Sequence, residues 1–403
     1  MNEVLMLKVT GEDQLGLTSA LTTILAQADI TILDMGQSVI HDQVSLGMLL
    51  KFPESVDASN TIKNVLFCAH ELGIRATFTP VKSENYQHWV SQQGKDRFIL
   101  TLLGRQLNGS DIAAVSNVIS KQGLNIQDIS RLTGRLSLNQ ENNKSKSCIE
   151  FSLRGLPNNP EKLRAEFLEI CGKHNVDIAF QEDNVYRRNR RLVAFDMDST
   201  LIEAEVIDEL AKEAGVGDEV SRITELAMQG KLDFNESFKQ RMALLKGLDE
   251  SVLEKIAHNL PITEGAERLI RTLKQYGYKT AILSGGFNYF GKYLQKKFGI
   301  DYVYANELEI KDGKVTGNVI GRVVNGERKA ELLKEIAEKE NIRIEQTIAV
   351  GDGANDLPML SLAGLGIAFR AKSIVEQSAK QSISTLGLDG VLYLLGFKDQ
   401  DII

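Results

Sequence analysis

The chain has 403 residues, of which 43% are hydrophobic and 25% charged, and its formal net charge is -7. This length predicts two or three folding units, and the balanced composition excludes a long disordered or fibrous region. The acidic balance argues against a general nucleic-acid-binding surface, because affinity for a phosphate backbone comes from clustered lysine and arginine. We therefore expect a packed multidomain protein that binds no nucleic acid.

The N-terminal residues and the cysteines indicate the cellular compartment in which the protein is expected. Residues 1–8 contain an early glutamate and no apolar signal core, and no apolar stretch reaches the ~18 residues needed to span a bilayer. The three cysteines show no C-x-x-C spacing, so neither a disulfide framework nor a zinc knuckle is indicated. We expect no membrane insertion and a cytoplasmic location.

The first half of the chain contains a diverged internal repeat. In the first copy, the patterns predict strands at 4–9, 30–35, 44–52 and 74–78, and helices at 16–28 and 59–72. In the second copy, they predict strands at 98–103, 124–129, 148–153 and 176–180, and helices at 110–122 and 160–173. Each copy then has the ferredoxin-like order βαββαβ, which leaves one sheet face open. We expect the copies to pack on one another or across a dimer.

This half, roughly residues 1–183, resembles a tandem pair of ACT domains, which are amino-acid-sensing modules of many biosynthetic enzymes. We assign the two domains to residues 1–83 and 96–183. Residues 11–17, Gly-Glu-Asp-Gln-Leu-Gly-Leu, resemble the effector loop of that family, and residues 104–110 match it more loosely. Gly16 stands at the helix start, where backbone N–H groups can receive a carboxylate. The alternative is that the glycines only form strand-to-helix turns.

A basic run, Tyr-Arg-Arg-Asn-Arg-Arg, occupies residues 186–191. A short charge run between two patterned regions is typical of a solvated linker rather than of an RNA or membrane contact. We interpret residues 184–191 as an exposed linker between domains.

The second half, residues 192–403, has the pattern of a parallel α/β sheet. Short apolar runs suited to strands buried on both faces occur at 192–195, 280–283, 347–350 and 365–369. Helical patterns separate them, for example at 265–275 and 328–339. In such sheets the ligand crevice lies at the carboxyl ends of the strands, so chemistry is expected just after each run.

The residues after these runs are polar. Asp-Met-Asp-Ser-Thr follows the first strand at 196–200, and two carboxylates at a strand tip are costly without a cation. Ser-Gly-Gly follows the second at 284–286, at a predicted helix start that favours a phosphate. Gly-Asp-Gly-Ala-Asn-Asp follows a later strand at 351–356, and Lys329 begins the helix before it. Each segment alone is also a common turn sequence, but their order on successive strand ends points to chemistry.

Together these segments match the four motifs of the haloacid dehalogenase superfamily. The resemblance implies a Rossmann-like fold, a Mg²⁺ cofactor and a phospho-aspartyl intermediate. Asp196 would be the nucleophile, and Asp198 would act as general acid and base, since none of the five histidines falls in a motif. The implied phosphate and substrate ligands are Ser284, Gly285, Lys329 and Asn355. The implied metal ligands are Asp196, Asp352 and the carbonyl of Asp198, with Asp356 in support.

The insert at about 205–260 is mostly helical in pattern and corresponds to the cap of that superfamily. Its sequence resembles the cap of the phosphoserine phosphatase family, as does the predicted hairpin at 306–317. By that resemblance, Glu205 takes the substrate ammonium, Arg241 takes its carboxylate, and Met228 and Phe234 shield the site from water. Taken singly, these residues would be ordinary exposed charges and helix packing; their shared spacing favours the functional interpretation.

The resemblance therefore implies Mg²⁺-dependent hydrolysis of O-phosphoserine, the last step of serine biosynthesis. It also implies serine as an effector, with its carboxylate near Gly16 and its ammonium near Asp13, in a homodimer. One rival is a phosphotransferase of the same superfamily with another substrate, including a phosphomutase. A second rival is an amino-acid sensor that retains an inactive catalytic fold. P-type ion pumps share the phospho-aspartate chemistry but require membrane helices that the sequence lacks.

Overall fold

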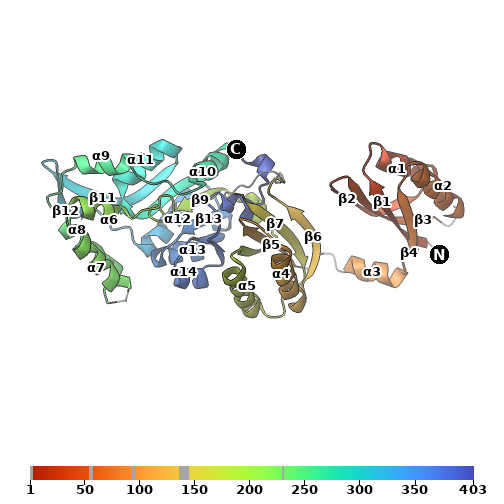
Figure 1. The fold of residues 1–403 in the computed structure, drawn as a ribbon, viewed down its shortest axis with the longest axis horizontal. Helices are drawn as coiled ribbons and strands as arrows, with labels where there is room; N and C mark the ends of the chain where they lie inside the picture. The colour runs from red at the N-terminus through yellow and green to blue at the C-terminus, as the bar shows by residue number, and fades with distance from the viewer. Residues whose placement is uncertain (1–2, 54–57, 92–93, 95, 136–144, 229–230) are drawn as a thin grey trace. The chain divides into compact units, whose positions relative to one another are not determined.

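The computed structural model describes residues 3–53, 58–91, 94, 96–135, 145–228 and 231–403, and Figure 1 shows its elements. The chain divides into two compact units, residues 1–95 and residues 96–403, called here the first and second unit. In the described part, no helix combines the length and the apolar character needed to cross a membrane.

The first unit contains the first copy of the repeat. Its elements are β1 (Glu3–Glu12), α1 (Leu17–Gln27), β2 (Thr31–Ile40), β3 (Gln43–Phe52), α2 (Ala58–Glu71), β4 (Arg75–Pro80) and α3 (Ser83–Ser91). The four strands form an antiparallel sheet in the order β2-β3-β1-β4. The predicted βαββαβ order is confirmed, whereas α3 was not predicted. Along β1, Leu7 and Val9 are buried and Lys8 and Thr10 are exposed, so this strand buries one face.

The second unit begins with the second copy. Its elements are β5 (Arg97–Gly104), α4 (Gly109–Lys121), β6 (Asn125–Arg131), β7 (Ser147–Arg154), α5 (Pro160–His174) and β8 (Asp177–Glu182). The sheet order, β6-β7-β5-β8, is the same as in the first copy, and the predicted element order is again confirmed.

The remainder of the second unit is built on a seven-stranded sheet in the order β12-β11-β10-β9-β13-β14-β15. Its strands are β9 (Leu192–Phe195), β10 (Lys279–Phe287), β11 (Tyr302–Lys311), β12 (Lys314–Ile320), β13 (Thr347–Gly351), β14 (Leu365–Phe369) and β15 (Gln381–Ile383). All neighbours pair in parallel except β11 and β12, which form the predicted hairpin. The expected parallel α/β sheet is confirmed.

Helices cover both faces of this sheet. One face packs on α10 (Ala266–Gln275), α11 (Asn288–Phe298) and α15 (Gly390–Leu394), and the other on α12 (Gly326–Lys339), α13 (Leu357–Leu362) and α14 (Ser373–Ser378). The cap is helical, as predicted, with α6 (Val206–Glu213), α7 (Gly217–Met228), α8 (Phe234–Leu244) and α9 (Ser251–His258).

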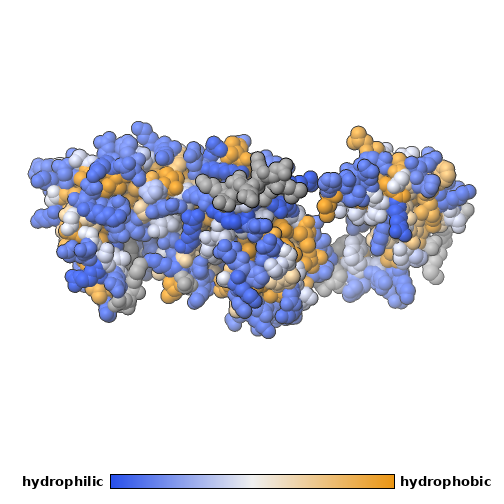
Figure 2. All heavy atoms as spheres, in the orientation of Figure 1, coloured by the Kyte–Doolittle hydropathy of each residue, from blue (hydrophilic) through white to orange (hydrophobic). Residues whose placement is uncertain are grey.

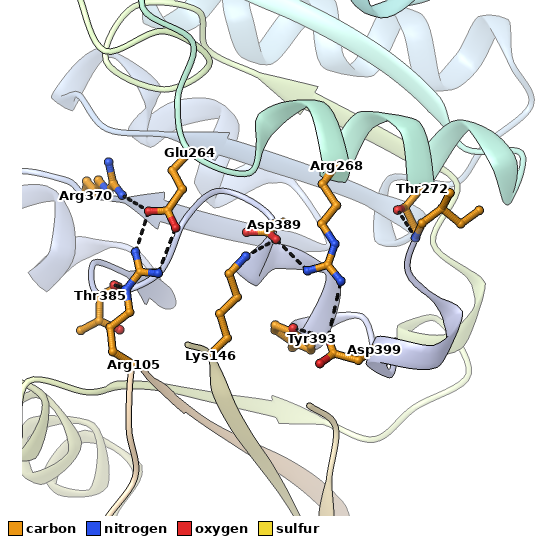
Figure 3. A network of polar contacts seen from close by, with 11 residues as sticks. Arg105, Lys146, Glu264, Arg268, Thr272, Arg370, Thr385, Asp389, Tyr393 and Asp399 are labelled. Carbon is orange, nitrogen blue, oxygen red and sulfur yellow. Dashed lines mark hydrogen bonds and ion pairs between the residues drawn. The ribbon is translucent and has the colours of Figure 1, made fainter. Parts of the chain in front are cut away.

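The second copy is packed against this catalytic part. Leu103, Cys148 and Ala179 point away from the helices of their own copy and join the apolar core of the catalytic part. Polar contacts also cross that interface, and Figure 3 shows one network of them. Both Nη atoms of Arg105 donate to the carboxylate of Glu264, at 2.9 and 2.6 Å. The second copy and the catalytic part therefore form one compact unit.

The basic run corrects one sequence interpretation. Arg187 and Arg190 are each only 7% exposed, so the prediction of a solvated run was wrong for these two side chains. Arg187 forms an ion pair with Glu150 of β7, which removes much of the cost of burying its charge. Arg188 is exposed, as expected. The domain boundaries that the sequence predicts inside residues 96–403 stay predictions.

All three cysteines are free, so none forms a disulfide in the structure.

Candidate active site

The carboxyl ends of three adjacent parallel strands bring the motifs together. β9 lies between β10 and β13, so Asp196, which follows β9, comes close to the ends of both neighbours. These strand ends face a cavity of about 1250 Å³. In the described part of the chain, seven of the predicted site residues line it: Asp196, Asp198, Glu205, Arg241, Gly285, Asp352 and Asn355. Two others, Ser284 and Lys329, are fully buried beside this set.

Lys329 holds two of the carboxylates. Its Nζ lies 2.8 Å from Oδ2 of Asp196 and 2.7 Å from Oδ1 of Asp356. Burial acts to lower the pKa of Lys329, but the charges of Asp196 and Asp356 outweigh it and raise that pKa above its ordinary value. The side chain is therefore a fixed cation next to Asp196, whose Oδ1 accepts the N–H of Met197 at 2.7 Å.

Asp198 has a different environment from Asp196. Burial, together with the charges of Glu205 and Asp196, raises the pKa of Asp198 well above its ordinary value. A carboxyl group with a raised pKa can carry a proton at neutral pH and donate it. Glycine at position 286 permits this arrangement, because a Cβ there would lie 2.5 Å from Oδ2 of Asp198.

Three carboxylates form a cluster that fits a divalent cation. One oxygen from each of Asp196, Asp352 and Asp356 lies within 4.8 Å of the others. Burial and the charge of Asp196 raise the pKa of Asp352 to about 8 and that of Asp356 to about 7. Crowded carboxylates of this kind are stabilised by a hard cation, which prefers oxygen ligands. The carbonyl of Asp198 as a further ligand stays a prediction.

The cap contributes one anionic and one cationic group. Glu205 precedes α6, and its Oε1 accepts a hydrogen bond from Ser199 at 2.8 Å. Arg241 lies on α8 and makes two long contacts, to the carbonyl of Ser237 at 3.4 Å and to Oγ1 of Thr224 at 3.5 Å. Burial lowers the pKa of Arg241, although the charges of Asp208 and Glu205 oppose this effect. Both groups face the cavity, so a ligand there meets both signs of charge.

Some predicted residues are not placed in the site. The side chains of Met228 and Phe234 lie outside the described part of the chain, so their shielding role stays a prediction. Asp13 and Gly16 lie in the loop between β1 and α1 of the first unit. Asp13 is exposed, and Gly16 has a left-handed φ of 87° that favours glycine. Their role as effector ligands also stays a prediction.

The sequence analysis missed two residues that shape the site. Lys372 lines the cavity and follows β14, so the strand-end rule that found the other motifs could have found it. Asn306 was named only as part of the hairpin, yet its buried amide donates to the carbonyl of Gly285 at 2.7 Å and accepts the N–H of Val324 at 2.9 Å. It thereby fixes the loop after β10.

Matches to known families agree with this geometry. Residues 193–361 match the haloacid dehalogenase-like hydrolase family, and residues 3–79 match the ACT domain family. Fold and site thus define a haloacid dehalogenase-like hydrolase, with a cluster of carboxylates at its strand ends and a helical cap.

Relatives narrow the class further. The chain is 37% identical over 398 residues to a phosphoserine phosphatase of Streptomyces coelicolor, covering 99% of this chain and 93% of that protein. It is 48% identical over 247 residues to a phosphoserine phosphatase of Archaeoglobus fulgidus, covering 61% and 72% respectively. A solved structure of a probable phosphoserine phosphatase from Vibrio cholerae is 34% identical, with a TM-score of 0.59 over 76% of this chain and 87% of that one. The chain therefore belongs to the phosphoserine phosphatase family, an enzyme family with metal-dependent chemistry.

Proposed function

We propose that the protein hydrolyses O-phosphoserine to serine and inorganic phosphate, with Mg²⁺ as its cofactor. One observation carries the choice of substrate: Glu205 and Arg241, of opposite charge, line the same cavity as Asp196. A zwitterionic amino acid needs a carboxylate for its ammonium and a guanidinium for its carboxylate, whereas a sugar phosphate needs neither. The intact set of reacting groups argues against an inactive sensor.

In the first half-reaction, the carboxylate of Asp196 attacks phosphorus and the bond to the serine oxygen breaks. Asp198 donates its proton to that oxygen, so serine leaves as an alcohol and an aspartyl-phosphate remains. Lys329, 2.8 Å from Asp196, offsets the negative charge that gathers there. Ser284, the N–H groups after it and Asn355 hold the phosphoryl oxygens.

In the second half-reaction, Asp198 is a carboxylate and takes a proton from the attacking water. The oxygen of that water bonds to phosphorus, the bond from phosphorus to Asp196 breaks, and phosphate leaves. A bound Mg²⁺ would neutralise phosphoryl charge, and Asp196, Asp352 and the carbonyl of Asp198 would hold it with support from Asp356. Met228 and Phe234 would exclude bulk water beneath the cap.

A substrate panel tests the proposal. Phosphate release is measured from phosphoserine, phosphothreonine, a sugar phosphate and an aryl phosphate, with Mg²⁺ and with chelator, and Asp196→Asn serves as the inactive control. Arg241→Met should lower kcat/KM for phosphoserine by about 10- to 100-fold and spare the aryl phosphate, which has no carboxylate. A wild-type preference for the sugar phosphate, or equal losses on both substrates in Arg241→Met, would contradict the proposed substrate.

We also propose that the first unit binds serine, through Asp13 and the N–H groups near Gly16, and that the protein is a homodimer. The match of residues 3–79 to the ACT domain family supports this regulatory role. Titration with L-serine of the wild type and of Asp13→Ala tests it. Inhibition that is purely competitive and unchanged in the variant would restrict serine to the active site.

A further inference from the structure

A second cavity, of about 720 Å³, lies where the second copy meets the edge of the catalytic sheet. Residues of α5 and β8 line one side, and residues 364–366, 376, 379–382, 384 and 385 line the other. In Figure 1, α5 lies beside α14, and β8 contacts β15. Among the residues that the structure describes, none lines both this cavity and the active site. Its volume falls within the range of about 300–1,000 Å³ that is usual for small-molecule sites.

Part of the wall of this cavity is aromatic. Phe98 and Phe180 stack with their ring centroids 4.8 Å apart, and the ring of Phe167 lies 6.1 Å from that of Phe180. Leu163 and Leu168 extend the apolar lining. Such a wall suits the apolar body of a ligand rather than a fully hydrated ion.

Most polar groups of the lining already have partners. The carboxylate of Asp177 accepts hydrogen bonds from the N–H of Ser384 at 2.8 Å and from the N–H and hydroxyl of Thr385 at 2.9 and 2.6 Å. The side-chain amide of Gln381 bonds to both backbone groups of Phe180. The guanidinium of Arg164 donates to backbone carbonyls of residues 377 and 379. These groups hold the walls together and leave little capacity for a ligand.

Arg190 is the exception among the buried charged groups of the lining that the structure describes. It is 7% exposed, its Nε has no hydrogen-bond partner, and it forms no ion pair with another described residue. Its two remaining contacts are long, 3.5 Å to the carbonyl of Thr347 and 3.4 Å to Oε1 of Gln181. Burial, together with the charge of Arg187, lowers the pKa of Arg190 to about 10. Burying a cation without a counter-ion destabilises the fold, and a bound anion would remove that cost.

We propose that this cavity binds a small organic monoanion, with its carboxylate on Arg190 and its apolar body against Phe167 and Phe180. A single guanidinium matches one carboxylate in a two-point fork. The two other cations of the lining are less suited to a ligand, because Arg164 donates to backbone carbonyls and Lys380 is exposed. A dianion such as a phosphate monoester would therefore have Arg190 as its buried partner and would also meet the carboxylates of Asp177, Glu182 and Glu376, which line the same cavity. The preferred ligand class is therefore an aryl- or alkyl-carboxylic acid.

Isothermal titration calorimetry of the full chain tests this site with three acids, 4-phenylbutanoate, indole-3-acetate and octanoate, and with the neutral 4-phenylbutanol. At least one acid should bind once per chain and more tightly than the alcohol. Arg190→Met should lower the affinity for that acid by at least about tenfold, which is the usual contribution of a charge-assisted hydrogen bond. Arg188→Met, which changes an exposed arginine of the same run, and Arg241→Met in the active site should leave binding unchanged.

Three results would overturn the proposal. They are no saturable binding of any of the acids at millimolar concentration, equal affinity for acid and alcohol, and binding that Arg190→Met does not weaken. If Arg190→Met fails to fold, Cys171→Phe decides in its place, because Cys171 lines the cavity and a larger side chain there narrows the apolar part. Acid binding that persists undiminished in folded Cys171→Phe would place the ligand elsewhere.

Discussion

The two copies of the repeat share one fold but bury their sheets differently. In each, the first strand has a glycine at or next to its end, Gly11 in β1 and Gly104 in β5. The residue before it is the exposed Thr10 in the first copy and the fully buried Leu103 in the second. In the second copy, both faces of β5 are therefore covered. The helices of the copy pack on one face, and the catalytic part packs on the other. A few outward-facing positions decide whether such a module stands as its own unit or becomes part of an enzyme.

The loops after these glycines differ in the same way. Arg105, after Gly104, donates to Glu264 and to the carbonyl of Thr385. Its counterpart in the first copy, Glu12, is exposed, as are Asp13 and Gly16. The second loop is therefore used for docking, and the first loop remains the candidate for an effector.

Truncation should give the largest difference in stability between the two copies. A chain that starts at Asp96 should keep phosphoserine hydrolysis and its thermal midpoint, because the first unit has a core built from its own residues. A chain that starts at Val185 should lose stability, because it uncovers the partners of Leu103, Cys148 and Ala179. Each large apolar side chain that is exposed costs about 1.5–3 kcal/mol. Thermal unfolding and gel filtration of both chains measure the difference.

Equal stability of the two truncated chains would show that the second copy adds nothing to the catalytic part. Loss of activity in the chain that starts at Asp96 would instead make the first unit necessary for catalysis.

A matched pair of point variants gives a smaller effect. Leu103→Ala should cost about 2–5 kcal/mol of unfolding free energy, because it leaves a cavity between the second copy and the catalytic part. Thr10→Ala, at the equivalent exposed position, should stay within about 0.5 kcal/mol. Urea unfolding of the full chain measures the effect of both substitutions, with the unfolding transition of each unit analysed separately. A cost below 1 kcal/mol for Leu103→Ala would mean that this interface is loose in solution.

Much of this contrast was present in the sequence. The run Phe-Ile-Leu-Thr-Leu-Leu at 98–103 is nearly continuous in apolar residues, as expected for burial on two faces, whereas Lys8 interrupts the run at 4–9. The strand-end motifs likewise predicted which residues meet in the active-site cavity, because parallel strands place their carboxyl ends along one edge.

Other features depend on contacts that no local pattern encodes. Arg187 is buried because Glu150, 37 residues away in the chain, comes to its side in the fold. The cavity at Arg190 needs both the second copy and the sheet edge at β15, so a basic run alone could only suggest a linker. Helix α3 was missed because it has only 9 residues and none of its side chains is buried, so its few apolar residues are too short a pattern to reveal a helical period.

The smallest expected effect concerns the loop that begins with Arg105, after β5. Arg105→Met should cost under about 1 kcal/mol, because the side chains of Arg105 and Glu264 are 30% and 33% exposed and Arg370 still contacts Glu264. A double-mutant cycle with Glu264→Gln isolates the pair from general packing effects. Its coupling energy should be favourable and should shrink from low to high salt, since dissolved ions screen a partly exposed pair. Glu12→Met at the equivalent exposed position should leave unfolding unchanged within about 0.5 kcal/mol. A coupling energy of zero at low salt would mean that Arg105 does not hold the second copy to the catalytic part, and that apolar contacts such as Leu103 do so alone.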